Sequence, residues 1–164
     1  MDRPLTPSDF WVKLKYKDND RSTGEVVDWH PLLAHSADVA AVTEALLRRT
    51  ILHDRLASLI GWDDLSDVHV ARLAALAALH DAGKVTQGFQ NRAFGKKPES
   101  DHVTPMVNVY NASYPLAYLA PLGVADLPHW SDDLDVLGHL LLATFGHHGA
   151  PVTPGPPDPM LWEA

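Results

Sequence analysis

The stretch LAALAALHDAGKVTQGFQ, residues 73–90, decides how this chain can fold. Its first half is an alanine- and leucine-rich run that is apolar on every side, and it ends abruptly on the adjacent pair His80 and Asp81. Burying an unpaired carboxylate is costly, so such a group takes up a proton, finds a partner or binds a metal. The rest of the sequence has to show which of these applies to Asp81.

The composition indicates one globular domain, because 164 residues with 46% hydrophobic content can build a sizeable core. The start of the chain, MDRPLTPSDFWVKLK, mixes charged and apolar residues unlike a signal peptide, and no apolar run reaches the roughly 18 residues of a membrane span. The chain has no cysteine, which excludes disulfides and thiolate metal sites. We therefore expect a cytoplasmic protein without membrane association, in which His, Asp or Glu would hold any metal.

The charge distribution limits the kinds of nucleic-acid protein that this chain can be. A net charge of −8 argues against a protein that coats nucleic acid, but not against a nuclease, whose carboxylates are neutralised by metal ions. Residues 82–98 contain no acid and carry four basic side chains: Lys84, Arg92, Lys96 and Lys97. Any single one of these charges is most simply explained as a solvated side chain on a loop.

Hydrophobic periodicity predicts a helical protein. One helix begins at Pro31 and carries positions 35, 39, 42 and 46 on one face. A second spans about 67–80, with Gly83 as its stop, and a third opens on Ser131 as N-cap and ends at Gly146. The fold class is therefore all-α.

Three segments differ from this helical pattern. WVKLKYK near the start is the one convincing extended segment, and Pro115 should break the apolar stretch 103–120. The proline-rich stretch 151–164 is predicted to be a linker or loop, which leaves residues 1–150 as the domain.

The histidines are placed where helices could bring them together. His35 and His80 lie on predicted inward faces, and the pair His147 and His148 follows the third helix between two glycines. A buried histidine is more often a hydrogen-bonded core residue than a ligand, but several at helix ends beside an aspartate favour a metal centre between helices. Mn, Fe, Co, Ni and Zn all suit such donors.

The other histidines are assigned to different roles. We expect surface positions for His53, His69 and His129, a place at the start of the first helix for His30, and a solvent-facing or core role for His139. Asp38 follows His35 by three residues, so its carboxylate is expected to orient the His35 ring.

Four segments in order, HPLLAHSADVAAV, LAALHDAGKVTQGFQ, DHVTPMV and FGHHGAP, resemble the HD-type nuclease domain of the CRISPR-associated type I nuclease-helicase. The resemblance runs from about Trp11 to Pro151, and it implies a helical bundle around a metal centre that degrades single-stranded DNA. In that family the domain is fused to, or works beside, a helicase that is recruited to a guide-RNA surveillance complex.

The resemblance also implies a set of site residues. His35, His80 and Asp81 would hold one divalent metal, and Asp81 would bridge to a second one held by His102, His147 and His148. Asp81 and Lys84 would be the catalytic residues, with Lys84 beside the scissile phosphate, and the DNA-binding side chains would be Lys84, Arg92, Lys96 and Lys97. His139 is the alternative to His102, and the metals could be Mn, Co, Ni, Fe, Mg or Zn.

The chain departs from the family pattern at one ligand. The first metal of the family takes a further aspartate from a helix well downstream of the His-His pair, whereas here only Asp158 follows, in the proline-rich stretch. We therefore expect the chain to stop before the final helices of the domain. Two other functions stay open: a nucleotide phosphohydrolase of the wider HD superfamily, and a non-catalytic docking module.

Overall fold

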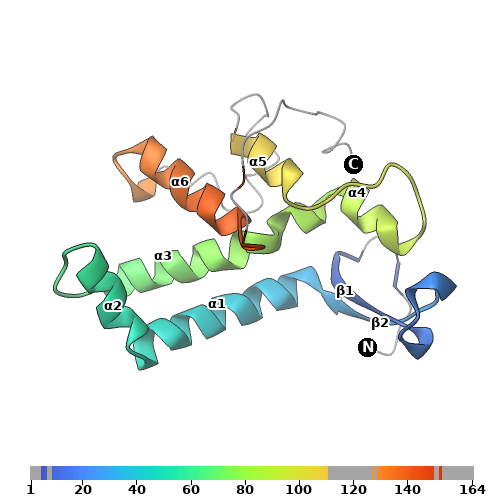
Figure 1. The fold of residues 1–164 in the computed structure, drawn as a ribbon, viewed down its shortest axis with the longest axis horizontal. Coiled ribbons are helices and arrows are strands. Elements are labelled where there is room, and N and C mark those ends of the chain that lie inside the picture. Colours follow the sequence, from blue (N-terminus) through green and yellow to red (C-terminus); the bar gives the residue numbers. More distant parts are fainter. Residues whose placement is uncertain (1–4, 7–8, 111–126, 128, 150–151, 153–164) are drawn as a thin grey trace.

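The computed structural model describes residues 5–6, 9–110, 127, 129–149 and 152, and the fold of these residues is mostly helical (Figure 1). Helices α1 (Leu32–Arg49) and α3 (Asp67–Ala78) run side by side through its centre, and α6 (Leu134–Phe145) lies across α3. The predicted all-α class is therefore confirmed in outline. Within the described ranges, no helix is long and apolar enough to cross a membrane.

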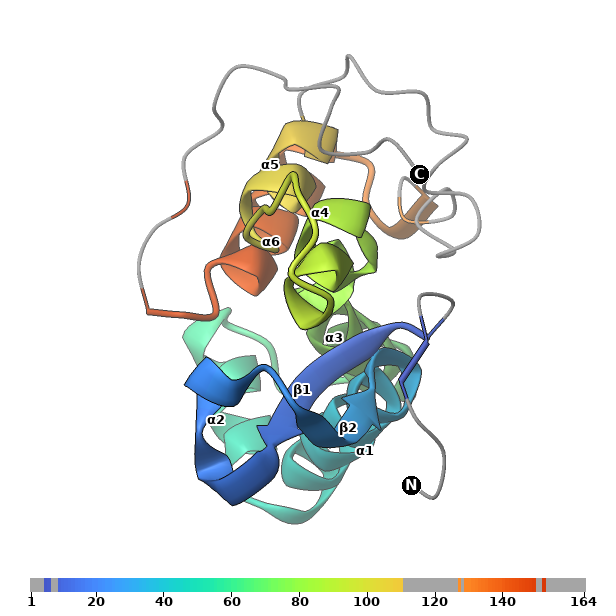
Figure 2. The same ribbon diagram turned by 90° about the vertical axis from the view of Figure 1, so that its right-hand side faces the viewer.

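A two-stranded hairpin precedes the helices. Strand β1 (Trp11–Tyr16) is the predicted extended segment, and it pairs antiparallel with β2 (Val26–Pro31). The sequence analysis missed β2, because VVDWHP contains a charged residue and a proline and buries only Trp29. The hairpin packs beside the start of α1 and close to α4 (Gln87–Gln90) (Figure 2).

Helix α1 begins one residue later than predicted, and its inward face agrees with the prediction at His35 and Val39 but not at positions 42 and 46. Pro31 is the last residue of β2, with extended backbone, and it caps the helix rather than opening it. Val42 and Leu46, predicted to face inward, are 58% and 44% exposed. The side facing the protein runs instead along small or medium side chains between two buried leucines, namely Leu32, Ser36, Val39, Ala40, Thr43 and Leu47. Because Ser36 and Thr43 are polar, the hydrophobic periodicity did not mark them as inward-facing and assigned Val42 and Leu46 to the buried face instead.

The loop between α1 and α3 contains a second unpredicted element, α2 (Leu52–Leu59). Ala57 of α2 packs with Leu47, Leu65 and Val70 into one small core. Ser66 caps α3 by accepting a hydrogen bond from the backbone of His69, whose ring in turn accepts one from Ser66. This reciprocal cap fixes the start of α3.

The chain tightens into a 3-10 helix, η3 (Leu79–Val85), directly after α3. Gly83 lies inside this turn and does not stop the helix in a left-handed conformation, so that prediction was wrong. Its role is close packing, because a Cβ atom at residue 83 would overlap the backbone carbonyl of His102 and lie 2.9 Å from Met106 Cγ.

The remaining elements are α4, the 3-10 turn η4 (Asn91–Ala93), α5 (Thr104–Tyr110) and α6. Asp133, rather than the predicted Ser131, caps α6, and Ser131 accepts a hydrogen bond from the Asp133 backbone. Ala82 of η3, Met106 of α5 and Phe145 of α6 form a core that joins these three elements. Pro115 and the proline-rich stretch predicted for 151–164 lie outside the described residues, apart from Val152.

Candidate metal centre

Asp81 lies where α1, η3, the turn before α5 and the end of α6 meet, and it is almost fully buried, with a side chain that is 4% exposed. Each of its carboxylate oxygens faces a different pair of histidines. Oδ2 lies 3.2 Å from His80 Nε2 and 3.3 Å from His35 Nε2. Oδ1 lies 3.3 Å from His102 Nε2 and 3.5 Å from His147 Nε2. One carboxylate therefore stands between two groups of imidazoles.

The ligand atoms form two compact groups. His35, His80 and Asp81 make one and His102, His147 and His148 the other, and within each group the donor atoms lie within 4.8 Å of one another. His148 Nε2 is also 3.0 Å from His102 Nε2. The structure thus gathers all six residues that the sequence analysis had named as metal ligands.

Each ligand comes from the end of an element, which explains why short sequence motifs mark them. His35 is in the first turn of α1, His80 and Asp81 open η3, and His147 and His148 follow α6. His102 precedes α5, where Asp101 accepts hydrogen bonds from the backbone of Val103 and Thr104 and so fixes the turn. In Figure 1 the end of α6 reaches the junction of α3 and η3.

His80 is held in an orientation that suits a ligand. Its Nδ1 lies 2.8 Å from the backbone carbonyl of Ala77, so Nδ1 carries a proton and Nε2 points to Asp81. Such a bond fixes the ring and leaves Nε2 for a metal once its proton is displaced. The hydrogen bond to Asp81 raises the pKa of His80, which burial alone would lower.

The electrostatics of the centre favour the anionic form of Asp81 and the neutral forms of His35, His102 and His147. Burial would raise the pKa of Asp81, but hydrogen bonds from His80 and Lys84 and their charges hold it well below its usual value. Burial lowers the pKa of His35 and His147. Burial and the charge of Lys84 lower the pKa of His102 to about 4. Neutral imidazoles and an ionised carboxylate are the forms that bind divalent cations.

One buried atom of the centre suits a bound cation. Asp81 Oδ1 is shielded from solvent and has no hydrogen-bond partner among the described residues, although two histidine nitrogens face it. A buried polar atom without a partner is costly, and a metal ion between Oδ1 and those nitrogens would satisfy all three. The donor set and this orphaned oxygen therefore fit a divalent metal.

Lys84 occupies the remaining polar side of the carboxylate. Its Nζ donates to Asp81 Oδ2 at 2.8 Å, and its side chain is 13% exposed. Gln90 holds the loop that carries Lys84: its side-chain amide donates to the Lys84 carbonyl and to the Trp11 carbonyl, while its oxygen accepts from the Trp11 backbone. The sequence motif included Gln90 without a role, and the structure shows that it ties β1 to η3.

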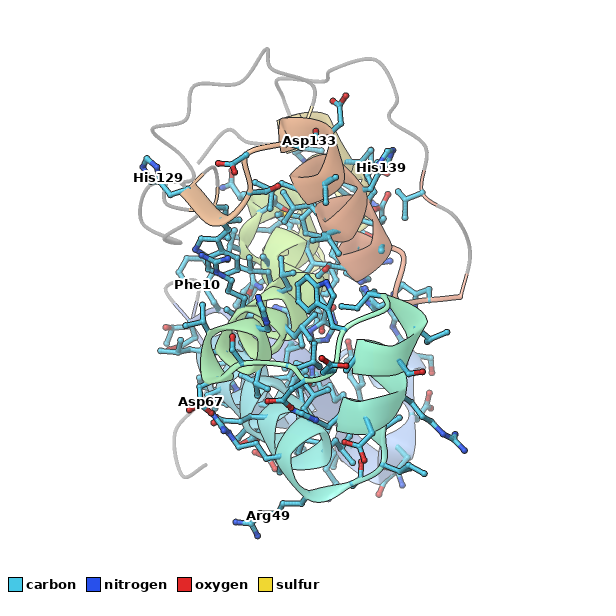
Figure 3. All side chains as sticks on the ribbon, turned by 90° about the vertical axis from the view of Figure 1, so that its left-hand side faces the viewer. Phe10, Arg49, Asp67, His129, Asp133 and His139 are labelled. Atoms are coloured by element: carbon cyan, nitrogen blue, oxygen red, sulfur yellow. The ribbon has the colours of Figure 1, made fainter. Side chains whose placement is uncertain are left out.

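The expected role of Asp38 was wrong, whereas His139 faces solvent, one of the two roles expected for it. The Asp38 carboxylate lies 3.8 Å from His30 Nε2 rather than beside His35, because its side chain points to solvent and is 75% exposed. His139, the alternative to His102, is exposed on α6 and takes no part in either ligand group (Figure 3). His129 is exposed as predicted, whereas His53 and His69 are partly buried in local hydrogen bonds.

Of the four predicted DNA-binding residues, only Lys84 lies beside Asp81. Arg92 stacks over Phe89, with its Cζ 5.5 Å from the ring centre, and Lys96 lies near Phe94. Lys97 pairs with Glu99 at 2.8 Å. An apolar hollow of about 450 Å³ borders the centre on another side, lined by His80, His147 and apolar side chains of α1, α3 and α6.

Replacing His102 with Gln should flatten the acid sensitivity of the metal-free chain. In the unfolded chain His102 takes up a proton near its ordinary pKa of 6.5, but in the folded chain only near 4, so acidification between these values favours unfolding. His102 should account for about 3 kcal/mol of the loss in unfolding free energy of the wild type, and this share should be absent from His102→Gln. Urea unfolding of chelator-treated protein at pH 7, 5.5 and 4.5 measures it. His129→Gln is the control, and equal pH slopes in all three proteins would contradict the assigned burial of His102.

Comparison with known proteins agrees with this geometry. The family described as "Cas3, HD domain" matches residues 11–159. A stretch of 62 residues is 42% identical to the protein named CRISPR-associated endonuclease/helicase Cas3 from Thermus thermophilus. That stretch is 38% of this chain and 7% of the relative, so the chain corresponds to a small part of that protein. No solved structure gives a significant match. Because the family match covers most of the chain, the chain belongs to the Cas3 HD-domain family.

Proposed function

We propose that this chain is a metal-dependent nuclease domain that hydrolyses phosphodiester bonds of single-stranded DNA with two divalent metal ions. The observation that carries the proposal is the shared carboxylate of Asp81, whose two oxygens face two separate imidazole groups. Sites with two cations held close together are typical of enzymes that cleave phosphodiesters.

The metal ligands fall into two sets that share one carboxylate. His35 and His80 would hold one ion, His102, His147 and His148 the other, and Asp81 both. When bound, the two ions would supply a nucleophilic water and Lewis-acid neutralisation of the attacked phosphate. Burial lowers the pKa of His35, His102 and His147, so protons compete less with metal ions for the nitrogens of these imidazoles.

Lys84 is proposed to neutralise charge on the phosphate in the transition state. Its ammonium now pairs with Asp81. Once cations neutralise that carboxylate, the ammonium is free to donate to a non-bridging phosphate oxygen at the same place. Asp81 and Lys84 are thus the two proposed catalytic residues.

The decisive experiment incubates the purified, chelator-stripped chain with labelled single- and double-stranded DNA. Mn, Co, Ni, Fe, Mg and Zn are added back separately. We expect degradation of the single strand with at least one of these metals, and little of the duplex. Metal binding without hydrolysis of any strand would instead favour a docking module, and preferential hydrolysis of free nucleotides would favour a nucleotide phosphohydrolase.

Lys84→Met should slow cleavage by about 100-fold while metal content stays unchanged, because loss of one charge-stabilising donor typically costs 10²–10³ in rate. Methionine keeps most of the apolar stem of lysine and removes the ammonium, which lies 5.5 Å from the centre of the Phe89 ring. Elemental analysis and single-turnover cleavage measure the two quantities on the same sample. Loss of metal together with activity would show that Lys84 acts through the structure of the site instead.

The proposed partners follow from the relative. Because that protein is named an endonuclease/helicase, we propose that a helicase domain or subunit delivers the single strand, and that a guide-RNA surveillance complex directs both. Duplex DNA should then become a substrate only when a cognate helicase and ATP are added. Degradation of duplex at the same rate without a helicase would contradict this division of labour.

A further inference from the structure

A second cavity, separate from the metal centre, lies between the hairpin and the loop after α4. It has a volume of about 470 Å³, within the range of pockets that hold small ligands. Tyr16 and Arg21 reach it from the hairpin, and Arg92 and Phe94 from the opposite wall. In Figure 1 the loop that follows α4 lies over the hairpin end at the right of the molecule.

We propose that this cavity, here called the hairpin cleft, binds a nucleotide of a single strand whose neighbouring phosphate lies at the metal centre. The proposal rests on the proposed nuclease function for the strand that enters, but the cleft can be tested by binding alone. Its chemistry is that of a single-strand site, which combines cationic groups for phosphates with aromatic rings for bases.

The arginine side chains of the hairpin cleft make it suited to bind an anion. Arg21 and Arg92 line it, while none of its lining residues is acidic. Arg92 Nε is shielded from solvent and has no hydrogen-bond partner among the described residues, so no carboxylate of that part of the chain engages this atom. Glu99 is the acid whose pKa both arginines help to lower, but its first partner is Lys97, at 2.8 Å. Within the described part of the chain, therefore, no hydrogen bond or ion pair joins either arginine side chain to a carboxylate, although the charge of Glu99 acts on both.

The aromatic rings provide the second element. Tyr16 and Phe94 are both partly exposed where they line the cavity. The ammonium of Lys96 lies 5.8 Å from the centre of the Phe94 ring. Ala93, Gly24 and Gly95 complete the lining, and apart from its own chain neighbours no atom lies within 4 Å of the position where either glycine would carry a Cβ. A base can therefore approach the rings without meeting a side chain at these positions.

Phe89 connects the hairpin cleft to the metal centre. Lys84 Nζ and Arg92 Cζ each lie 5.5 Å from the centre of this buried ring, and the His102 ring centre is at the same distance. The two cationic groups are therefore no more than twice 5.5 Å apart. A strand whose scissile phosphate is beside Lys84 would thus bring an adjacent nucleotide to Arg92.

The test measures binding of a fluorescein-labelled 12-residue oligothymidylate to the full chain in chelator, where no cleavage occurs. Arg21 is exposed, so Arg21→Glu should fold normally, and we expect about 10-fold weaker binding with a smaller salt dependence. Phe94→Leu keeps an apolar side chain but removes the ring, and should weaken binding about 5-fold. The matched control is Arg49→Glu, which makes the same charge change at the far end of α1 (Figure 3) and should shift affinity less than about 2-fold.

A small substrate separates failure of the cleft from failure of the proposed function. Bis(p-nitrophenyl) phosphate carries one phosphodiester and no neighbouring nucleotide, so its hydrolysis by the wild type with added metal tests the metal centre independently of oligonucleotide binding in the hairpin cleft. Equal weakening by Arg21→Glu and Arg49→Glu, or no oligonucleotide binding by the wild type, would overturn the cleft. Absence of hydrolysis by the wild type would count against the nuclease and leave the binding comparison intact.

Discussion

Asp81→Asn is expected to remove both metal ions and to lower DNA cleavage by on the order of 10³-fold or more, because losing even one charge-stabilising group costs 10²–10³ in rate. Asparagine preserves the shape of the side chain and one oxygen, but not the negative charge that faces both imidazole groups. The substitution also leaves the partly buried ammonium of Lys84 beside a neutral amide.

The control for this variant is Asp38→Asn. Asp38 is an acid on α1 near the centre, but its carboxylate faces His30 and solvent. We expect it to retain metal content and cleavage, and circular dichroism should show that both variants are folded. An Asp81→Asn protein that keeps both ions and its activity would contradict the assignment of the shared ligand.

Gly83→Ala is expected to destabilise the chain by about 3 kcal/mol or more, at the upper end of overpacking effects. The added methyl group would collide with the backbone of His102, which cannot rotate away as a side chain could. The midpoint of thermal unfolding should fall by roughly 6–12 °C for a domain of this size. Because His102 must move, metal affinity should fall as well.

Gly24→Ala serves as the comparison for the glycine effect alone. Gly24 has a positive φ of 67° in the hairpin turn, and no atom lies within 4 Å of its missing Cβ. Gly24→Ala should lower the free energy of unfolding by about 1 kcal/mol, because alanine is less stable than glycine in a left-handed backbone conformation. Equal destabilisation by the two substitutions would mean that the contact between η3 and His102 is looser than described.

The candidate metal ligands could be named from the sequence because they stand at element ends beside strong local signals. An apolar helix that stops on His80 and Asp81, and a His-His pair between glycines, both require a chemical explanation. His102 needed the family resemblance, since nothing in DHVTPMV itself separates a ligand from a loop histidine, and its competitor His139 proved to be exposed.

Other features depended on contacts that no local pattern encodes. The buried face of α1 was misplaced at positions 42 and 46, because Ser36, Ala40 and Thr43 carry little hydrophobic signal yet allow α1 to pack on α3. Gly83 looked like a helix stop, but the segment that requires it, at His102, is distant in sequence. Strand β2 forms because β1 pairs with it, so its own sequence provided little indication.

The direction of the Asp38 side chain could not be predicted from its spacing to His35 along the helix. A residue three positions after His35 is a neighbour on the helix surface, but whether it faces that histidine depends on what else is near. Here His30 of β2 lies beside α1, and Asp38 turns to it. The strand that supplies His30 had not been predicted, so this contact could not be either.

The central claim is that one carboxylate is shared by two metal sites, and counting the metals tests it most directly. After equilibrium dialysis against Mn, Co or Ni, elemental analysis should give two ions per wild-type chain, one each for His35→Ala and His147→Ala, and none for Asp81→Asn. A single ion in the wild type that both histidine variants lose, or two ions that persist in Asp81→Asn, would contradict the account.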